Sequence, residues 1–326
     1  MIVGHKRQWE FLKNAADSNR LPHAVLFSGE QGLGKKKLAV EFVKFLNCEN
    51  GAGLKPCGVC RSCMDIERNS YPDFTLYEPI DGKEIQISKI RDLILKLSLH
   101  SYSNSFKAVI IDQAHLMTKE AQNCFLKTLE EPKGNAVLIL ITEYPQSLIS
   151  TILSRVQKIK FFSVNKGEIR DYLVKKGANS SSADSLSSLS CGRPGLALSF
   201  LKDKNKLNNY EKFISDIIQI SRSDFSFRFQ YAKNLIKDKD DNQKENLKEV
   251  LEVWLRFFRE LLFLNVSSSE NDKISFLPDN QKLDMMKNYP LKKIKRLISL
   301  IQSTDYLTTA TNANPRLAFE LLLMEI

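Results

Sequence analysis

An apolar run, a glycine-rich loop and a helical pattern follow one another near the N-terminus, and this order constrains the fold more than any other feature. The segment reads HAVLFSGEQGLGKKKLA over residues 23–39. In a phosphate-binding loop, glycines let backbone amides surround a phosphate group, and a lysine after them reaches the phosphate oxygens. Because a buried strand precedes the loop and a helix follows it, we expect a phosphate-binding loop formed by Gly29, Gly32, Gly34 and Lys35.

Two substitutions remove the chemistry that such a loop usually supports. Lys36 stands where a Ser or Thr hydroxyl would ligate the Mg²⁺ ion of a nucleotide, and an ammonium group repels that ion. Asp112 has the position of the second Mg²⁺ element, but Gln113 replaces the Glu that would activate water. An amide cannot accept a proton, so general-base catalysis is lost. We therefore predict no ATP hydrolysis and no tight ATP binding; weak binding by Lys35 and the loop amides stays open.

The first half of the chain alternates buried strands with helices, which indicates a parallel sheet covered by helices on both faces. The expected strands, besides the run before the glycine loop, are 73–78, 107–113 and 136–142, and the helices between them are 88–99 and 118–131. After about residue 207 the apolar spacing is helical throughout. The sequence thus predicts an α/β domain followed by an all-α region.

Four cysteines lie close together with the spacing C-x8-C-x2-C-x2-C. Four thiolates at this spacing can form a closed tetrahedral shell around Zn²⁺, which is typical of a structural site. We predict that Cys48, Cys57, Cys60 and Cys63 bind one zinc ion in a knuckle over 48–63, and four unligated thiols in a loop are the alternative.

Composition is that of an ordinary globular chain with a basic charge balance. The 326 residues are 43% apolar and carry a net charge of +10. Such a charge favours contact with nucleic acid or an acidic partner, although a lysine-rich composition in general explains it equally well. No apolar run has the length of a membrane span, and the N-terminus lacks the apolar core of a signal peptide. We expect a cytoplasmic protein without membrane contact.

Four segments together resemble the bacterial clamp-loader subunits of DNA polymerase III. They are LPHAVLFSGEQGLGKKKLA (21–39), the four-cysteine insertion, NCFLKTLEEP (123–132) and TILSR (151–155). The resemblance covers about the first 200 residues, and the helical remainder fits by pattern alone. Within that family the active ATPase subunit has an intact phosphate loop, whereas the delta-prime subunit often has a degraded one, as in this sequence.

The resemblance implies a AAA+ fold in three parts. These are an α/β phosphate-loop domain with a zinc-binding insertion over 1–165, a small helical lid over 166–205 and an all-α collar over 206–326.

The resemblance also assigns roles to residues outside the glycine loop. In the family, the Arg of a Ser-Arg-Cys element sits at a subunit edge and enters the neighbour's ATP site, where its guanidinium stabilises charge developing on the γ-phosphate. Here the element reads Ser154-Arg155-Val156, so the Cys is missing and the Arg remains. Arg155 is expected to act in trans. Thr142 falls near the first sensor position, and Arg193 lies where the second-sensor Arg would be.

The leading hypothesis is an ATPase-inactive clamp-loader subunit that is not an enzyme on its own. It would join ATPase (gamma/tau) and delta subunits in a hetero-pentamer and supply Arg155 while the sliding clamp is loaded onto primer-template DNA. An active ATPase subunit of the same family is the alternative, if Lys36 and Gln113 are compensated. A stand-alone zinc protein that binds nucleic acid is a third possibility, but it leaves the AAA+ framework unexplained.

Overall fold

The structure is a computed structural model, and it describes two units of the chain. The N-terminal unit comprises Met1–Gly177 with Gly192–Leu196, and the C-terminal unit comprises Ala178–Cys191 with Ala197–Ile326. The described residues are 2–50, 55–79, 83–99, 106–130, 134–236, 243–266, 288–311 and 313–326. The division at residues 165 and 205 stays a prediction.

Five parallel strands form the sheet of the N-terminal unit, in the order β2-β3-β4-β1-β5. The buried strand β1 (Ala24–Ser28) pairs with β4 (Ala136–Thr142) on one side and with β5 (Gln157–Lys160) on the other. On its other side β4 pairs with β3 (Lys107–Ile111), which in turn pairs with the edge strand β2 (Phe74–Tyr77). All five carboxyl ends therefore meet at one edge of the sheet, where the glycine loop follows β1. This is the α/β architecture with a parallel sheet that the sequence predicts.

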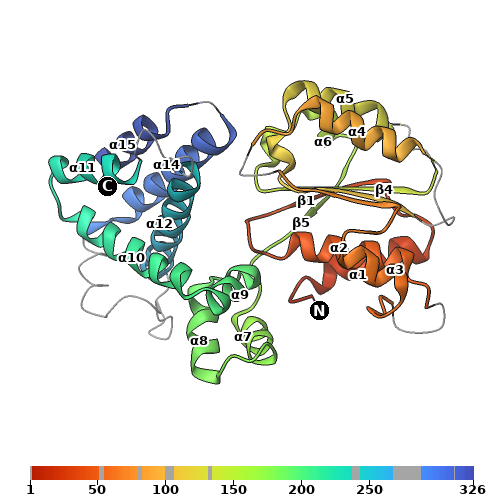
Figure 1. Ribbon diagram of the computed structural model, residues 1–326. Coiled ribbons are helices and arrows are strands. Elements are labelled where there is room, and N and C mark those ends of the chain that lie inside the picture. Colours follow the sequence, from red (N-terminus) through yellow and green to blue (C-terminus); the bar gives the residue numbers. More distant parts are fainter. Residues whose placement is uncertain are drawn as a thin grey trace. The chain divides into compact units, whose positions relative to one another are not determined.

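Helices cover both faces of this sheet (Figure 1). One face carries α1 (Lys6–Asp17), α2 (Lys35–Asn47) and α3 (Arg61–Glu67), and the other carries α4 (Ile87–Ser98), α5 (Lys119–Glu130) and α6 (Ser150–Leu153). Helix α7 (Lys166–Lys175) follows β5 in the same unit.

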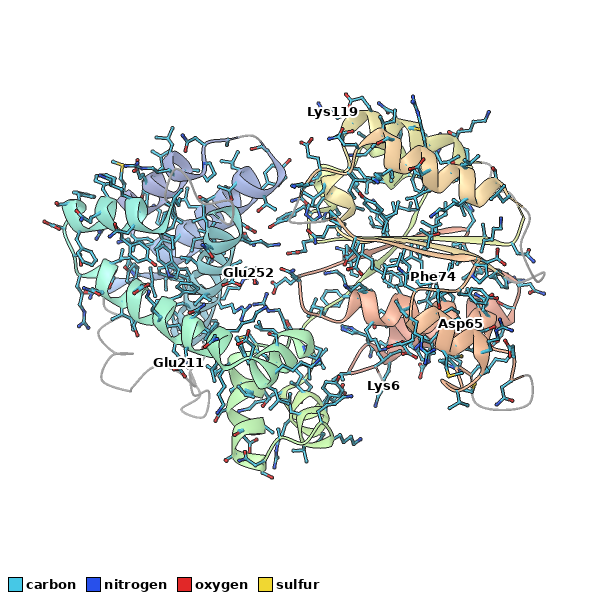
Figure 2. All side chains as sticks on the ribbon, viewed as in Figure 1. Lys6, Asp65, Phe74, Lys119, Glu211 and Glu252 are labelled. Atoms are coloured by element: carbon cyan, nitrogen blue, oxygen red, sulfur yellow. The ribbon has the colours of Figure 1, made fainter. Side chains whose placement is uncertain are left out.

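Side chains alternate along each strand between the two helical layers. Val25 and Phe27 pack into the cluster on the side of α1 and α2, whereas Leu26 packs into the cluster on the side of α4 and α5. Phe74, labelled in Figure 2, belongs to the first of these clusters. Because both faces are buried, the strands are nearly continuous apolar runs, as the sequence indicated.

The strands and helices expected in the first half are confirmed, with ends within two residues of the predicted ones. Strand β5 was not predicted. Its sequence, QKIK, has one buried side chain, Ile159, between exposed polar ones, so no apolar run marks it. Pairing with β1 makes it a strand in spite of its composition.

The C-terminal unit is helical in its described part. It contains α8 (Ser180–Leu189) and most of α9 (Pro194–Lys202), followed by α10 (Lys204–Ser221), α11 (Phe225–Leu235), α12 (Gln243–Val266), α14 (Leu291–Ala310) and α15 (Pro315–Glu325).

Trp254 on α12 lies at the centre of this unit. It is fully buried, and its indole ring lies against Tyr231 of α11 and Phe319 of α15. Its Nε1 donates to the carbonyl oxygen of Phe213 on α10, at 3.1 Å. One aromatic side chain thus connects four helices. Of the helices described, none combines the length and apolar character needed to cross a membrane.

Leu26→Ala is expected to lower the free energy of unfolding of the N-terminal unit by about 2–5 kcal/mol, because it leaves a cavity between the sheet and the layer of α4 and α5. Leu26 is fully buried. The chain has 2 tryptophans, and only Trp9 lies in the N-terminal unit. In a Trp254→Phe background, the fluorescence of Trp9 during a urea titration therefore reports the unfolding of the N-terminal unit.

The matched control is Leu95→Ala on α4, where the side chain is 63% exposed. It should change the free energy of unfolding by less than about 0.5 kcal/mol. Equal effects of the two substitutions would contradict the placement of β1 in the core.

Candidate functional site

The glycine loop connects β1 to α2, and its backbone admits no side chain at its first glycine. Gly29 has φ +149°, and a Cβ there would lie 2.7 Å from the carbonyl oxygen of Phe161. Its amide donates to the carbonyl oxygen of Thr142 at 3.2 Å, which ties the loop to the end of β4. Gly34, in the left-handed region, directly precedes α2. The predicted order of strand, loop and helix is confirmed.

Lys35 is turned toward its own loop. Its ammonium donates to the carbonyl oxygens of Gly29, at 2.5 Å, and Glu30, at 2.6 Å. The residue is only 6% exposed. The loop carbonyls thus hold the lysine that the sequence assigned to phosphate binding.

Lys36 faces two carboxylates that follow neighbouring strands. Its Nζ lies 3.1 Å from Oε1 of Glu78 and 3.8 Å from Oδ2 of Asp112. Glu78 directly follows β2 and Asp112 directly follows β3, and these strands pair with Tyr77 opposite Ile111. The two carboxylates therefore meet at the same edge of the sheet, with the ammonium beside them.

Asp112 is largely buried, and its environment holds the carboxylate in place. Burial raises the pKa of Asp112, and the charge of Lys36 is the largest effect opposing that rise. Oδ1 of Asp112 accepts from the backbone amide of Gln113 at 2.9 Å. Gln113 has φ +50°, in the left-handed region, and begins the short 3₁₀ helix Ala114–Leu116.

Thr142 ends β4 and is buried. Its Oγ1 accepts from the backbone amide of Tyr144 at 3.0 Å and lies 3.2 Å from Nδ1 of His115. The ring of His115, also buried, packs edge-on against Tyr144. The hydroxyl is therefore held at the end of the strand next to β1, and its sensor role stays a prediction.

The segment 192–196 lies against the glycine loop. The amide of Gly195 donates to the carbonyl oxygen of Gly32 at 2.8 Å. A Cβ on Gly195 would come within 2.9 Å of that oxygen, so this approach requires glycine. Arg193 is buried beside it, with its Cβ 3.6 Å from the place a Cβ on Gly32 would take. The structure brings Arg193 to the loop, while its second-sensor role stays a prediction.

Arg155 follows α6 and has a half-exposed side chain. Its Nη2 lies 2.6 Å from Oε1 of Glu130, and its Nη1 donates to the carbonyl oxygen of Thr151 at 2.9 Å. The side chains of Arg155 and Glu130 are 35% and 47% exposed. The guanidinium is thus oriented by the end of α5 and remains accessible to solvent.

Gln122, buried on α5, fixes the segment that leads to Arg155. Its Oε1 accepts from the amide of Ile149 at 2.8 Å, directly before α6. Its Nε2 donates to the carbonyl oxygen of Met117 at 3.0 Å. Since both ends of the amide are used in a buried site, Gln122 positions the start of α6.

The four cysteines of the knuckle converge. Their sulfur atoms all lie within 4.8 Å of one another. Tetrahedral Zn²⁺ with Zn–S bonds of about 2.3 Å requires sulfurs roughly 3.8 Å apart, so the group fits a closed zinc site. Backbone amides of Cys57, Cys60 and Cys63 donate to the sulfurs of Cys48, Cys57 and Cys60, respectively, at 3.3–3.5 Å. Residues 51–54 of the knuckle lie outside the described residues.

The thiols differ in acidity. Backbone amides of Val59 and Cys60 lower the pKa of Cys57 to about 6, whereas burial raises the pKa of Cys63 to about 12. Because metals bind thiolates, a metal ion bound by the four cysteines would displace their thiol protons. The effect is largest for Cys63, whose raised pKa keeps its thiol protonated.

A charge network anchors the knuckle helix α3 to α2. Lys44, which is buried, pairs with Glu67 at the end of α3 and with Glu41 on α2. Lys37 pairs with the same two carboxylates, each at 3.0 Å. The hydrogen bond from Lys44 is the main cause that lowers the pKa of Glu67 to about 2. The cysteine insertion and the helix of the glycine loop are therefore connected through ion pairs, with Lys44 as the buried member.

Known proteins match the N-terminal half of the chain. A family model described as "DNA polymerase III, delta subunit" matches residues 4–165. The DNA polymerase III subunit delta' of Bacillus subtilis (strain 168) is 38% identical over 170 residues, which are 52% of this chain and 51% of that protein. The N-terminal half of the chain is therefore similar to DNA polymerase III subunits.

Relatives in the clamp-loader family include more than one kind of subunit. The DNA polymerase III subunit tau of Escherichia coli (strain K12) is 36% identical over 172 residues, or 53% of this chain and 26% of that protein. A gamma subunit-related protein of Thermotoga maritima, a solved structure, has 19% identity, a TM-score of 0.47 and 97% coverage of both chains. The chain spans about half the length of the delta' relative. The similarity of the N-terminal half does not distinguish delta' from tau subunits.

Four residues around the candidate site were not predicted from the sequence. They are Glu78, His115, Gln122 and Gly195. Glu78 could have been found, because it follows a predicted strand directly, as Asp112 does. The other three act through contacts between segments distant in the sequence, and no local pattern marks them.

Glu67→Gln is expected to lower the free energy of unfolding of the N-terminal unit by about 1 kcal/mol at pH 7, because buried Lys44 loses a charged partner. The value is small because the Glu67 side chain is 51% exposed and solvent screens the pair. Its pKa falls from the ordinary 4.5 to about 2 in the folded protein, so the stabilisation is present above about pH 4.5 and is lost as the pH falls toward 2.

Urea titrations between pH 2 and 7 measure this difference, with Glu120→Gln on the exposed face of α5 as the control. Wild type and Glu67→Gln should converge as the pH falls. A difference that stays constant with pH would show that the ion pair is not its cause.

Proposed function

We propose that the chain is an ATPase-inactive, delta-prime-like subunit of a DNA polymerase III clamp loader. It assembles with ATPase (gamma/tau) and delta subunits in the cytoplasm and acts in a neighbour's ATP site during loading of the sliding clamp onto primer-template DNA. On its own it is not an enzyme.

One observation carries this proposal. The loop between β1 and α2 has the backbone of a phosphate loop, yet the ammonium of Lys36 faces Asp112 where an ATPase holds its metal ion. Gln113 supplies an amide where water activation requires a carboxylate. Both defects affect the chain's own site, so its contribution to ATP turnover is expected in another subunit.

Arg155 is the group that we expect to make this contribution. Its guanidinium is accessible and has a planar set of donors that matches phosphate oxygens. Gln122 holds the start of α6, so the arginine projects from a fixed segment. Val156 replaces the family's Cys in this element, and because the guanidinium supplies the electrostatic stabilisation, this change leaves the role intact.

The rest of the chain supports assembly in this proposal. Residues 166–205 form the lid, and the helices of 206–326 form the collar that joins the subunits of the hetero-pentamer. The net charge of +10 favours a place near DNA. The knuckle binds one structural zinc ion through Cys48, Cys57, Cys60 and Cys63.

An active clamp-loader ATPase is the second candidate. The similarity of the tau subunits, at 36% identity, favours it. Lys36 and Gln113 oppose it, and ATP hydrolysis by the purified chain, abolished by Lys35→Ala, would replace the first proposal by this one.

Arg155→Ala tests the trans role in a reconstituted loader with clamp and primed DNA. Turnover at the neighbour's site should fall by about a thousandfold, because the guanidinium acts on charge that develops in the transition state. Total ATP hydrolysis by the loader falls only by the fraction that the neighbour's site contributes. The affinity for ATP changes little, since ground-state binding does not depend on the Arg155 guanidinium. Single-turnover kinetics and nucleotide titration separate the two effects.

Arg91→Ala, an exposed arginine on α4, is the matched control for lost surface charge. Arg155→Lys should restore little, because an ammonium lacks the planar pair of donors. Normal clamp loading by an assembled Arg155→Ala complex would limit the chain to a structural role in the ring.

Elemental analysis of the purified chain in reducing buffer is expected to find one zinc per chain. Cys60→Ser should lose zinc and loosen the knuckle while the sheet stays folded, because the metal closes a local loop. Cys124→Ser is the control outside the knuckle and should keep its zinc. Well under one zinc in wild type, or global unfolding of Cys60→Ser, would contradict the structural zinc site.

A further inference from the structure

The residues around the glycine loop do not fit a divalent cation. Mg²⁺ prefers an octahedron of oxygen ligands at roughly 2.0–2.1 Å. Two oxygen donors are present, the carboxylates of Glu78 and Asp112, but the residue that should complete the set is Lys36. Its ammonium has three donors and no lone pair, so it cannot serve as a ligand.

The Lys36 ammonium instead supplies the positive charge that a metal ion would place beside the carboxylates. It lies 3.1 Å from Oε1 of Glu78 and 3.8 Å from Oδ2 of Asp112, so one positive charge faces both carboxylates. The Asp112 side chain is 19% exposed, and a buried carboxylate needs a counter-charge to remain ionised. Lys36 lies in the first turn of α2. The metal-ligating hydroxyl of a phosphate loop occupies the same position.

The geometry points to a tethered replacement for the metal ion. We infer that the Lys36 ammonium neutralises Glu78 and Asp112 and excludes divalent cations, and that the two carboxylates form a divalent-cation site once this ammonium is removed. Glu78 is thereby a functional partner of Asp112. This inference does not depend on the clamp-loader role, since it concerns only the chain's own loop.

Mn²⁺ titration of the full zinc-loaded chain, followed by the electron paramagnetic resonance of free Mn²⁺, tests the inference. Lys36→Met should bind one Mn²⁺ at least about tenfold more tightly than wild type, because a unit charge roughly 4 Å from a divalent ion is removed. Adding Glu78→Gln or Asp112→Asn should abolish the gain. Lys36→Thr is a second variant that keeps the test available if Lys36→Met does not fold, and its hydroxyl should bind at least as well.

Lys37→Met is the matched control. It removes the same charge from the next residue of α2, where the ammonium pairs with Glu41 and Glu67. Its Mn²⁺ binding should equal that of wild type. The inference is overturned if wild type already binds one Mn²⁺ as tightly as Lys36→Met, if Lys37→Met gains as much, or if the gain survives Glu78→Gln and Asp112→Asn.

Discussion

The pairing of β1 between β4 and β5 is the constraint on which the N-terminal unit depends. Because β1 is buried on both faces, its register with both neighbours is fixed, and the residues that follow each strand meet at one edge. Gly29 follows β1 at this edge. Its amide is bound to Thr142 at the end of β4, and it lies too close to Phe161, which follows β5, to carry a side chain. The sheet thus fixes the start of the loop.

The same loop satisfies its own charges. Lys35 donates to loop carbonyls, Lys36 faces the carboxylates that follow β2 and β3, and Gly195 closes against Gly32. The first two interactions use groups that a nucleotide or its metal would otherwise contact. These contacts within the chain are consistent with the proposed role, in which the reactive site belongs to a neighbouring subunit.

Much of the fold could be predicted from the sequence because buried parallel strands are plain apolar runs bounded by helical patterns. β5 could not, since an edge strand with one inward residue, Ile159, has no such pattern. In the candidate site, the loop glycines and the converging cysteines follow from local spacing. The pairing of Lys36 with Glu78, and of Arg155 with Glu130, arises only when the sheet brings distant segments together.

The central claim is that this chain acts in a neighbour's ATP site while its own loop carries no metal nucleotide. Electron cryo-microscopy of the assembled loader with a non-hydrolysable ATP analogue tests it most directly. We expect the Arg155 guanidinium within about 3 Å of the neighbour's γ-phosphate oxygens, released from Glu130. We also expect the Lys36 ammonium still between Glu78 and Asp112. A metal-bound nucleotide in the chain's own loop, with Arg155 still paired to Glu130, would contradict the account.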